Sequence, residues 1–167
     1  MAIVEIPYLD EKLDSENLKE VYDGVLEIDG KKVSLDLWFQ DSMCSIEELN
    51  KSINYLNNFK NVYQNAVHAI QDSFENKGEV RTLIEDHIEQ FEAADKKILG
   101  IDEAMTPNDQ IHHTYKKIHL SRIGLYPQTE EQFAILDFTI SKAVTQYVFV
   151  VRTNSLGKVM EEVYVES

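Results

Sequence analysis

Three of the five histidines lie close together near the middle of the chain, and imidazoles at short spacing are candidate metal ligands. His112, His113 and His119 are separated by one, six and seven residues. Adjacent side chains diverge by about 100° on a helix and face opposite sides of a strand. Seven residues span about 10 Å along a helix, and six span about 20 Å along a strand. We therefore expect no shared metal ion here, and no cofactor.

His87 and Cys44 are two further groups that could carry chemistry. His87 borders the apolar face of a predicted helix, where desolvation shifts the pKa of an imidazole. A histidine packed at an interface is the more common role for such a residue. Cys44 precedes another predicted helix in "DSMCSIEEL", but no histidine lies near it in the sequence. We expect it to act as a small apolar side chain rather than as a nucleophile.

Arg122 and Asp137 are charged residues within the apolar stretches "SRIGLYP" and "AILDFTI". If their strands are neighbours, the two side chains can form a cross-strand ion pair. A structural role in strand pairing is favoured over a catalytic one. The chain has no Walker loop, dinucleotide fingerprint, nucleophile elbow or paired Cys-x-x-Cys ligands. A hydrolase that uses Asp137 with His87 or His119 stays open as one alternative.

The elements that would position these residues follow from patterning. After an irregular segment over residues 1–20, "VYDGVLEIDGKKVSLDLWF" predicts a β-hairpin with Asp29-Gly30 as its turn. A two-residue loop pairs Ile28 with Lys31 and Leu26 with Val33, which places nearly every aliphatic side chain on one face. The pattern therefore predicts both the hairpin and its register.

Two helices are predicted next. Ser45 and Glu48 form a capping-box pattern, and apolar residues then repeat at three- and four-residue steps as far as Phe74. A second helix is predicted from about Val80 to Leu99, where Gly100 closes it. Thr106-Pro107 indicates a short third helix.

The C-terminal part has an extended pattern. Four strands are predicted, at 118–126, 133–141, 145–153 and 158–166. The last of these follows the turn "NSLG". The predicted fold is a single α+β domain over 1–167, with an N-terminal hairpin, two to three helices and a C-terminal four-stranded antiparallel meander.

Charge and composition exclude several functions. Thirty acidic residues face sixteen basic ones, a formal net charge of -14. Phosphate backbones and anionic lipids repel such a surface, so we expect no binding to nucleic acid or membranes. A basic partner protein would instead be attracted. The absence of a signal-peptide pattern, of a long apolar run and of a second cysteine predicts a cytoplasmic protein.

Several segments together resemble an uncharacterised bacterial family that is classified only as a domain of unknown function. The resemblance runs from about Tyr22 to the final residues. It implies no catalytic residues, and it suggests the small proteins found beside bacterial toxin systems, some of which act as immunity proteins. The segments that carry it are "VSLDLWFQD", "GEVRTLIEDHIEQ", "SRIGLYP", "AILDFTIS" and "TQYVFVVRTNSLGKVMEEVYVES".

The favoured function is a non-enzymatic acidic interaction protein, immunity-like in type, that binds a basic partner. One alternative is a small-molecule or peptide binding domain whose pocket lies between meander and helices, and Arg122, Asp137 and His87 are further candidate binding residues. Because "YVFVV" is apolar on both faces, we expect either a central strand or a contact with a second copy of the chain. The aromatic residues of the predicted pocket are Tyr126, Phe138, Tyr147 and Phe149.

Overall fold

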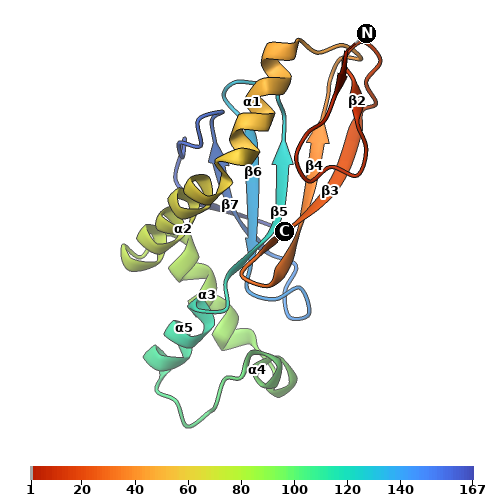
Figure 1. The fold of residues 1–167 in the computed structure, drawn as a ribbon. Helices are drawn as coiled ribbons and strands as arrows, with labels where there is room; N and C mark the ends of the chain where they lie inside the picture. Colours follow the sequence, from red (N-terminus) through yellow and green to blue (C-terminus); the bar gives the residue numbers. More distant parts are fainter. Residues whose placement is uncertain (1) are drawn as a thin grey trace.

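Residues 2–167, which the computed structural model describes, form the α+β fold that the sequence predicts (Figure 1). Two strands lie in the N-terminal segment that we expected to be irregular: β1 (Ile3–Val4) and β2 (Leu13–Asp14). The other strands are β3 (Val21–Ile28), β4 (Lys31–Trp38), β5 (His119–Leu125), β6 (Ala134–Thr139), β7 (Val148–Thr153) and β8 (Tyr164–Glu166). The helices are α1 (Ile46–Asn57), α2 (Phe59–Glu75), α3 (Glu79–Gln90), α4 (Ala93–Leu99) and α5 (Pro107–Tyr115).

The hairpin and the C-terminal strands belong to one sheet, with the order β3-β4-β5-β6-β7-β8. Strands β5 to β8 are antiparallel neighbours in sequence order, but β4 and β5 run parallel. The sheet is therefore mixed and six-stranded. The predicted C-terminal meander is antiparallel within itself, but it is not a separate sheet, because its first strand pairs in parallel with the hairpin. A parallel pair requires a crossover connection, and the helices between β4 and β5 supply it.

The hairpin has the predicted register, including Ile28 opposite Lys31 and Leu26 opposite Val33. Asp29 and Gly30 both have positive φ, 50° and 77°, as a two-residue type I′ turn requires. This register places the aliphatic side chains of β3 and β4 on the face that carries the core.

Residues 2–167 form five helices where two to three were predicted, because each long predicted helix is broken once. Asn58 adopts φ -101° and ψ 17° between α1 and α2, and an asparagine pair is a poor helix former. Phe91 is extended between α3 and α4, and Glu92 then caps α4. The predicted capping box at Ser45, the left-handed Gly100 and the Thr106 cap of α5 are confirmed.

The core lies on one face of the sheet. Helices α1 and α2 cross this face, and α3, α4 and α5 extend beyond one end of it (Figure 1). The buried cluster includes residues from Ile6 to Val163. Within it the hydroxyls of Tyr55 on α1 and Thr153 on β7 are hydrogen-bonded at 2.7 Å.

The other face of the sheet has no helix over it in Figure 1, and we call it the open face. Its side chains alternate with the core residues along each strand, and most are half-buried or exposed. Val150 is a buried exception, opposite Asp137 and Tyr164 on the neighbouring strands. The residues of the open face at its centre are Ser34, Asp36, Trp38, Arg122, Gly124, Tyr126, Ile135, Asp137 and Val150.

Strand β7 is internal, between β6 and β8. Its apolar residues on both faces are therefore explained by a central position, and a contact between copies is not required. At both outer edges of the sheet a backbone amide has a partner within the chain: the Val25 amide donates to the Tyr8 carbonyl, and the Val165 amide donates to the Glu79 carboxylate at 2.9 Å. Such coverage protects edge strands from pairing with another chain.

Among residues 2–167, no helix combines the length and apolar character needed to cross a bilayer.

Candidate functional site

Arg122 reaches the open face because β5 contains a bulge. Leu120 is opposite Phe138, and Arg122 is opposite Asp137, so Ser121 is an extra residue between the two pairs. Strict alternation would have placed Leu120 and Arg122 on the same face. The bulge instead leaves Leu120 in the core and directs Arg122 away from it, a common use of this irregularity.

The guanidinium of Arg122 joins three strands. It donates from Nε and Nη2 to the two carboxylate oxygens of Asp36 on β4, at 2.9 and 2.6 Å. It also donates from Nη1 to Asp137 on β6 at 3.1 Å and from Nη2 to the Tyr126 hydroxyl at 3.2 Å. The cross-strand ion pair of Arg122 with Asp137 is thus present, as predicted. We call Asp36, Trp38, Arg122, Tyr126 and Asp137 the Arg122 cluster.

Gly124 makes this arrangement possible. It lies opposite Asp36 and beneath the Arg122 side chain, and a Cβ atom at this position would be 2.7 Å from Nη2 of Arg122. It would also be 3.2 Å from the ring of Tyr126. Along the open face, "SRIGLYP" therefore presents the Arg122 guanidinium, then Gly124, which has no side chain, and then the Tyr126 ring.

The charges within the Arg122 cluster offset one another. Burial disfavours the charged form of Arg122, but the hydrogen bonds and charges of its partners outweigh this effect and raise its pKa. Burial raises the pKa of Asp137 above its usual value, and the charge of Arg122 reverses this only in part. Two carboxylates around one guanidinium leave a partly buried network with one excess negative charge.

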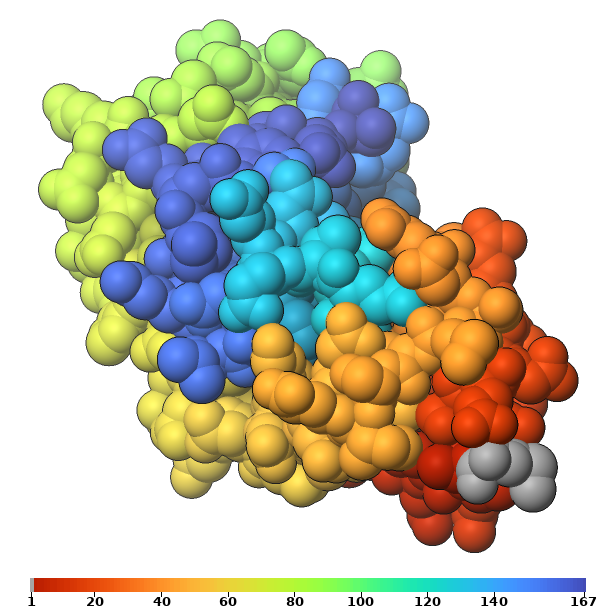
Figure 2. Space-filling model, turned by 90° about the horizontal axis from the view of Figure 1, so that it is seen from above, coloured from red at the N-terminus to blue at the C-terminus, as the bar shows by residue number. Residues whose placement is uncertain are grey.

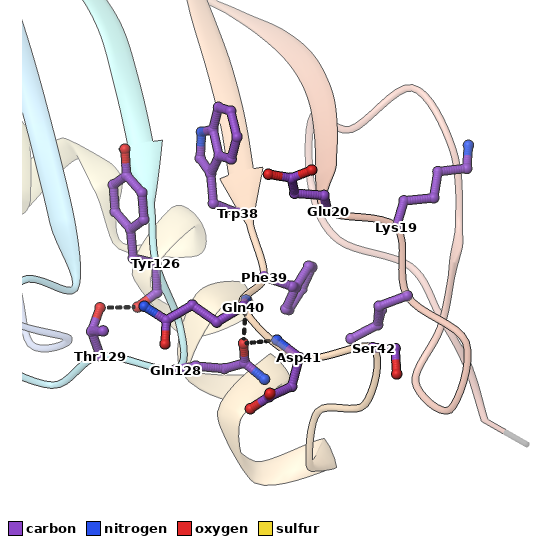
Figure 3. Close-up of a pocket in the computed structure, with 11 residues that line it drawn as sticks. Lys19, Glu20, Trp38, Phe39, Gln40, Asp41, Ser42, Tyr126, Gln128 and Thr129 are labelled. Carbon is purple, nitrogen blue, oxygen red and sulfur yellow. Dashed lines mark hydrogen bonds between the residues drawn. The ribbon is translucent and has the colours of Figure 1, made fainter.

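A crevice of about 550 Å³ opens beside this cluster. It lies beyond the carboxyl ends of β4 and β5, and Figure 2 looks down on this end of the molecule. Trp38 and Tyr126 project from the two strands in the same direction, and the Glu20 carboxylate is directed toward Trp38 (Figure 3). The indole N–H of Trp38 donates to Asp36, which links the crevice to the Arg122 cluster. We call this hollow the β4–β5 crevice.

The floor of the β4–β5 crevice is held by Gln128. Its side-chain oxygen accepts hydrogen bonds from the backbone N–H groups of Gln40 and Asp41, at 2.7 and 3.1 Å. Its side-chain nitrogen donates to the carbonyl of Met43 at 3.0 Å. One amide therefore joins the segment after β4 to the segment after β5, and it fixes the shape of the crevice.

The four aromatic residues that we predicted to line one pocket are not brought together. Phe138 and Phe149 are opposite each other on β6 and β7 and lie in the closed core, 2% and 1% exposed. Tyr126 lines the β4–β5 crevice, and Tyr147 lines a separate shallow depression beside α3. The predicted pocket between meander and helices is therefore corrected to two surface sites.

The histidine and aspartate arrangement of the hydrolase alternative is not formed by residues 2–167. His87 is buried beside Phe91 and Tyr147, and its Nε2 bonds the Thr145 hydroxyl at 2.8 Å. Burial lowers its pKa. His119 bonds the Lys117 carbonyl through Nδ1, and Asp137 bonds Arg122 instead. His87 thus has a packing role, in the contact between α3 and the segment that contains Thr145 and Tyr147.

Cys44 and the clustered histidines also have structural surroundings. Burial, together with the neighbouring Glu48 carboxylate, raises the pKa of the Cys44 thiol to about 12, so the thiol stays protonated. His112 packs against Phe74, and the neighbouring His113 bonds the Leu99 carbonyl through Nε2. Within residues 2–167, no three His, Cys, Asp or Glu side chains are grouped so that they could hold a metal ion.

Asp36, Trp38 and Glu20 are the site residues that sequence reasoning missed. The hairpin register placed Asp36 on the polar face, and alternation puts Trp38 on the same face. This signal was available in "LDLWF", but the neighbour of that face was not, because the parallel pairing of β4 with β5 has no local pattern. Glu20 lies in the segment that we expected to be irregular.

No protein-family model, curated protein or solved structure matches the chain. The resemblance to a bacterial family of unknown function therefore stays a prediction.

Proposed function

We propose that this chain is a non-enzymatic binding protein that recognises a basic partner protein through the open face of its sheet. The observation that carries the proposal is the Arg122 cluster beside the β4–β5 crevice. Tryptophan, tyrosine and arginine are the residues most enriched at the centres of protein interfaces. Trp38, Tyr126 and Arg122 lie together on a face that no helix covers.

The charged groups of this face are already paired, so a partner protein can cover them. A buried charge without a partner is costly, whereas a hydrogen-bonded ion pair is tolerated. Arg122 already bonds both Asp36 and Asp137, so a partner could exclude water from these groups without leaving them unpaired.

The excess of carboxylates supports the choice of a basic partner. The acidic residues outnumber the basic ones by fourteen. Seven basic side chains among residues 2–167 already form ion pairs within the molecule: Lys12, Lys19, Lys51, Arg81, Lys96, Arg122 and Arg152. The field around the molecule is therefore negative and would speed encounter with a basic surface.

The test is affinity capture with the tagged protein from lysate of the source cells, followed by mass spectrometry. We expect one basic protein to be retained at about 50 mM salt and released at about 500 mM, because salt screens exposed charges. The variant Trp38→Ala/Tyr126→Ala should lose this protein while it keeps a folded circular-dichroism spectrum. Ile98→Ala is the matched control, since Ile98 is an exposed apolar residue on α4.

Equal capture by the Trp38→Ala/Tyr126→Ala variant would rule out the open face as the binding surface. Capture of a protein that is not basic, or retention that does not depend on salt, would contradict the role of charge.

A further inference from the structure

We infer that the β4–β5 crevice is the acceptor for an arginine side chain of the partner. The inference rests on the proposed function and names the group that this function recognises. The crevice lies beyond the carboxyl ends of β4 and β5, the parallel neighbours of the sheet. In open α/β sheets, ligands bind outside the carboxyl ends of the parallel strands, and the parallel pair of β4 and β5 offers the same position here.

Two aromatic rings provide the surface on which a guanidinium can stack. Trp38 and Tyr126 project from adjacent strands into the crevice (Figure 3). The indole of Trp38 is held by its hydrogen bond to Asp36, so its face is presented in one orientation. A planar cation over an indole face is attracted by the ring quadrupole, and arginine is the side chain that uses this contact most often.

Two polar side chains at the crevice are free to accept hydrogen bonds. Neither the Glu20 carboxylate nor the Gln40 side-chain amide has a hydrogen-bond partner within the described part of the chain, and both line the crevice. A guanidinium offers five N–H donors in one plane. One edge could therefore bond Glu20 while the plane stacks on Trp38, and Gln40 could accept from a remaining N–H.

The lysine that lines the crevice does not fill this place. Lys19 points away from the rings in Figure 3, and its Nζ bonds the Glu11 carboxylate at 2.6 Å. The positive charge of Lys19 is thus already paired outside the crevice, and the carboxylate of Glu20 is left for a cation from another molecule.

The chain builds the same combination once more, with its own arginine in place. Near the opposite edge of the sheet, the guanidinium of Arg152 on β7 lies 4.9 Å from the centre of the Tyr164 ring on β8 and bonds Glu161 at 3.2 Å. Here an aromatic ring and a carboxylate hold an internal guanidinium. At the β4–β5 crevice the internal arginine, Arg122, bonds Asp36, Asp137 and the Tyr126 hydroxyl, so the Glu20 carboxylate beside Trp38 is left without a guanidinium of its own.

A second crevice, of about 600 Å³, is more acidic but suits this ligand less well. Asp72, Glu79, Glu161 and Glu162 line it, without a tryptophan or tyrosine. Glu79 already accepts from the Val165 amide, and Glu161 already pairs with Arg152. Two of the four carboxylates there thus have internal roles, and no tryptophan or tyrosine ring lines the crevice to offer a stacking surface.

The chain contains one tryptophan, Trp38, so its fluorescence reports on the crevice directly. The experiment titrates the whole protein with N-acetyl-arginine amide and with the neutral isostere N-acetyl-citrulline amide. Trp38 emission and the NMR signal of its indole N–H are followed. We expect saturable binding of the arginine compound, about ten-fold tighter than that of citrulline, because both the charge and the fork of donors contribute.

The variant Glu20→Gln should weaken binding of the arginine compound by about five- to ten-fold. Glu27→Gln is its matched control: it removes the same charge from the far end of β3, and it should leave binding within about two-fold. Equal affinities for arginine and citrulline, no saturable change, or no difference between the two variants would overturn the inference.

The two proposals fail in different ways. If Trp38→Ala/Tyr126→Ala loses the captured partner but the arginine compound does not bind, the open face is the interface and the arginine acceptor is wrong. If the arginine compound binds with the expected selectivity and no basic protein is captured, the acceptor stands and the proposed function fails.

Discussion

Arg122 and Asp36 are 86 positions apart in the chain and form a two-pronged ion pair across the parallel strands β4 and β5. Recognition of both carboxylate oxygens by two N–H groups along one edge of a guanidinium is the strongest form of this contact. The pair joins the N-terminal hairpin to the C-terminal strands on the face that the helices leave uncovered. It also orients Trp38, because the same carboxylate accepts the indole N–H.

Arg122→Met should destabilise the protein by about 2–3 kcal/mol, because Asp36 and Asp137 would be left partly buried without a cation. Arg122→Lys should recover only part of this loss, since one ammonium cannot bond both oxygens of Asp36 in the same way. The measurement is urea unfolding followed by far-UV circular dichroism. Lys12→Ala is the control, because both members of its ion pair are exposed and such pairs contribute less than about 1 kcal/mol. A loss no larger than that of the control would show that the cluster adds nothing to stability.

Gly124→Ala should disturb the same ion pair without removing a charge. The added Cβ would lie 2.7 Å from Nη2 of Arg122, so the guanidinium must shift from the position in which it bonds Asp36. We expect a cost of about 1–3 kcal/mol, as for other overpacked positions. In the double variant with Arg122→Met the two losses should be less than additive, because both remove the same contact. Full additivity in urea unfolding would mean that Gly124 serves another purpose.

The sequence was sufficient where the determinants are local. The hairpin register follows from alternation around Asp29-Gly30, and the Ser45 capping box and the Thr106-Pro107 start of α5 follow from side chains that bond nearby backbone groups. Each of these features is decided within a few residues, so patterning alone predicts it.

The rest depends on contacts that are distant along the chain. The bulge at Ser121 and the parallel pairing of Asp36's strand with that of Gly124 depend on which strand lies next to β5. The break at Phe91 arises where α4 turns away from α3, inside one continuous apolar pattern. The Arg122–Asp137 pair could be predicted because both residues interrupt apolar runs, whereas Asp36 was placed on the polar face of the hairpin with no sign of its partner.

Asp137→Asn should be tolerated better than Asp36→Asn. An amide oxygen at 137 can still accept from Nη1 of Arg122, and it removes a charge that burial disfavours, so we expect a cost below about 1 kcal/mol. Asp36 accepts two N–H groups from Arg122 and one from Trp38, and its amide variant should cost about 2 kcal/mol. A reversed order in urea unfolding would contradict this account of the cluster.

The difference in the free energy of unfolding between Asp137→Asn and the wild type should also depend on pH. The pKa of Asp137 is raised in the folded protein, first by burial, so folding favours its protonated form. This contribution is complete below the unfolded-state pKa of about 4 and is lost as pH rises through the folded-state value. The wild type should therefore gain stability relative to Asp137→Asn as the pH is lowered toward 4. Unfolding curves of both proteins between pH 7 and about pH 4 provide the test.

His87 predicts a pH dependence of the opposite sign. Burial lowers its pKa in the folded protein, and the Leu83 carbonyl and the Asp86 charge offset this only in part. The unfolded chain therefore binds the proton more readily, at a pKa of about 6.5. Stability from neutral His87 is fully present above that pH and is lost as pH falls through the folded-state pKa. Measured by thermal unfolding, the advantage of wild type over His87→Gln should shrink from pH 7.5 to about pH 5. His68→Gln on α2 is the control for loss of an imidazole, and an equal pH trend in both variants would show that His87 is not the group responsible.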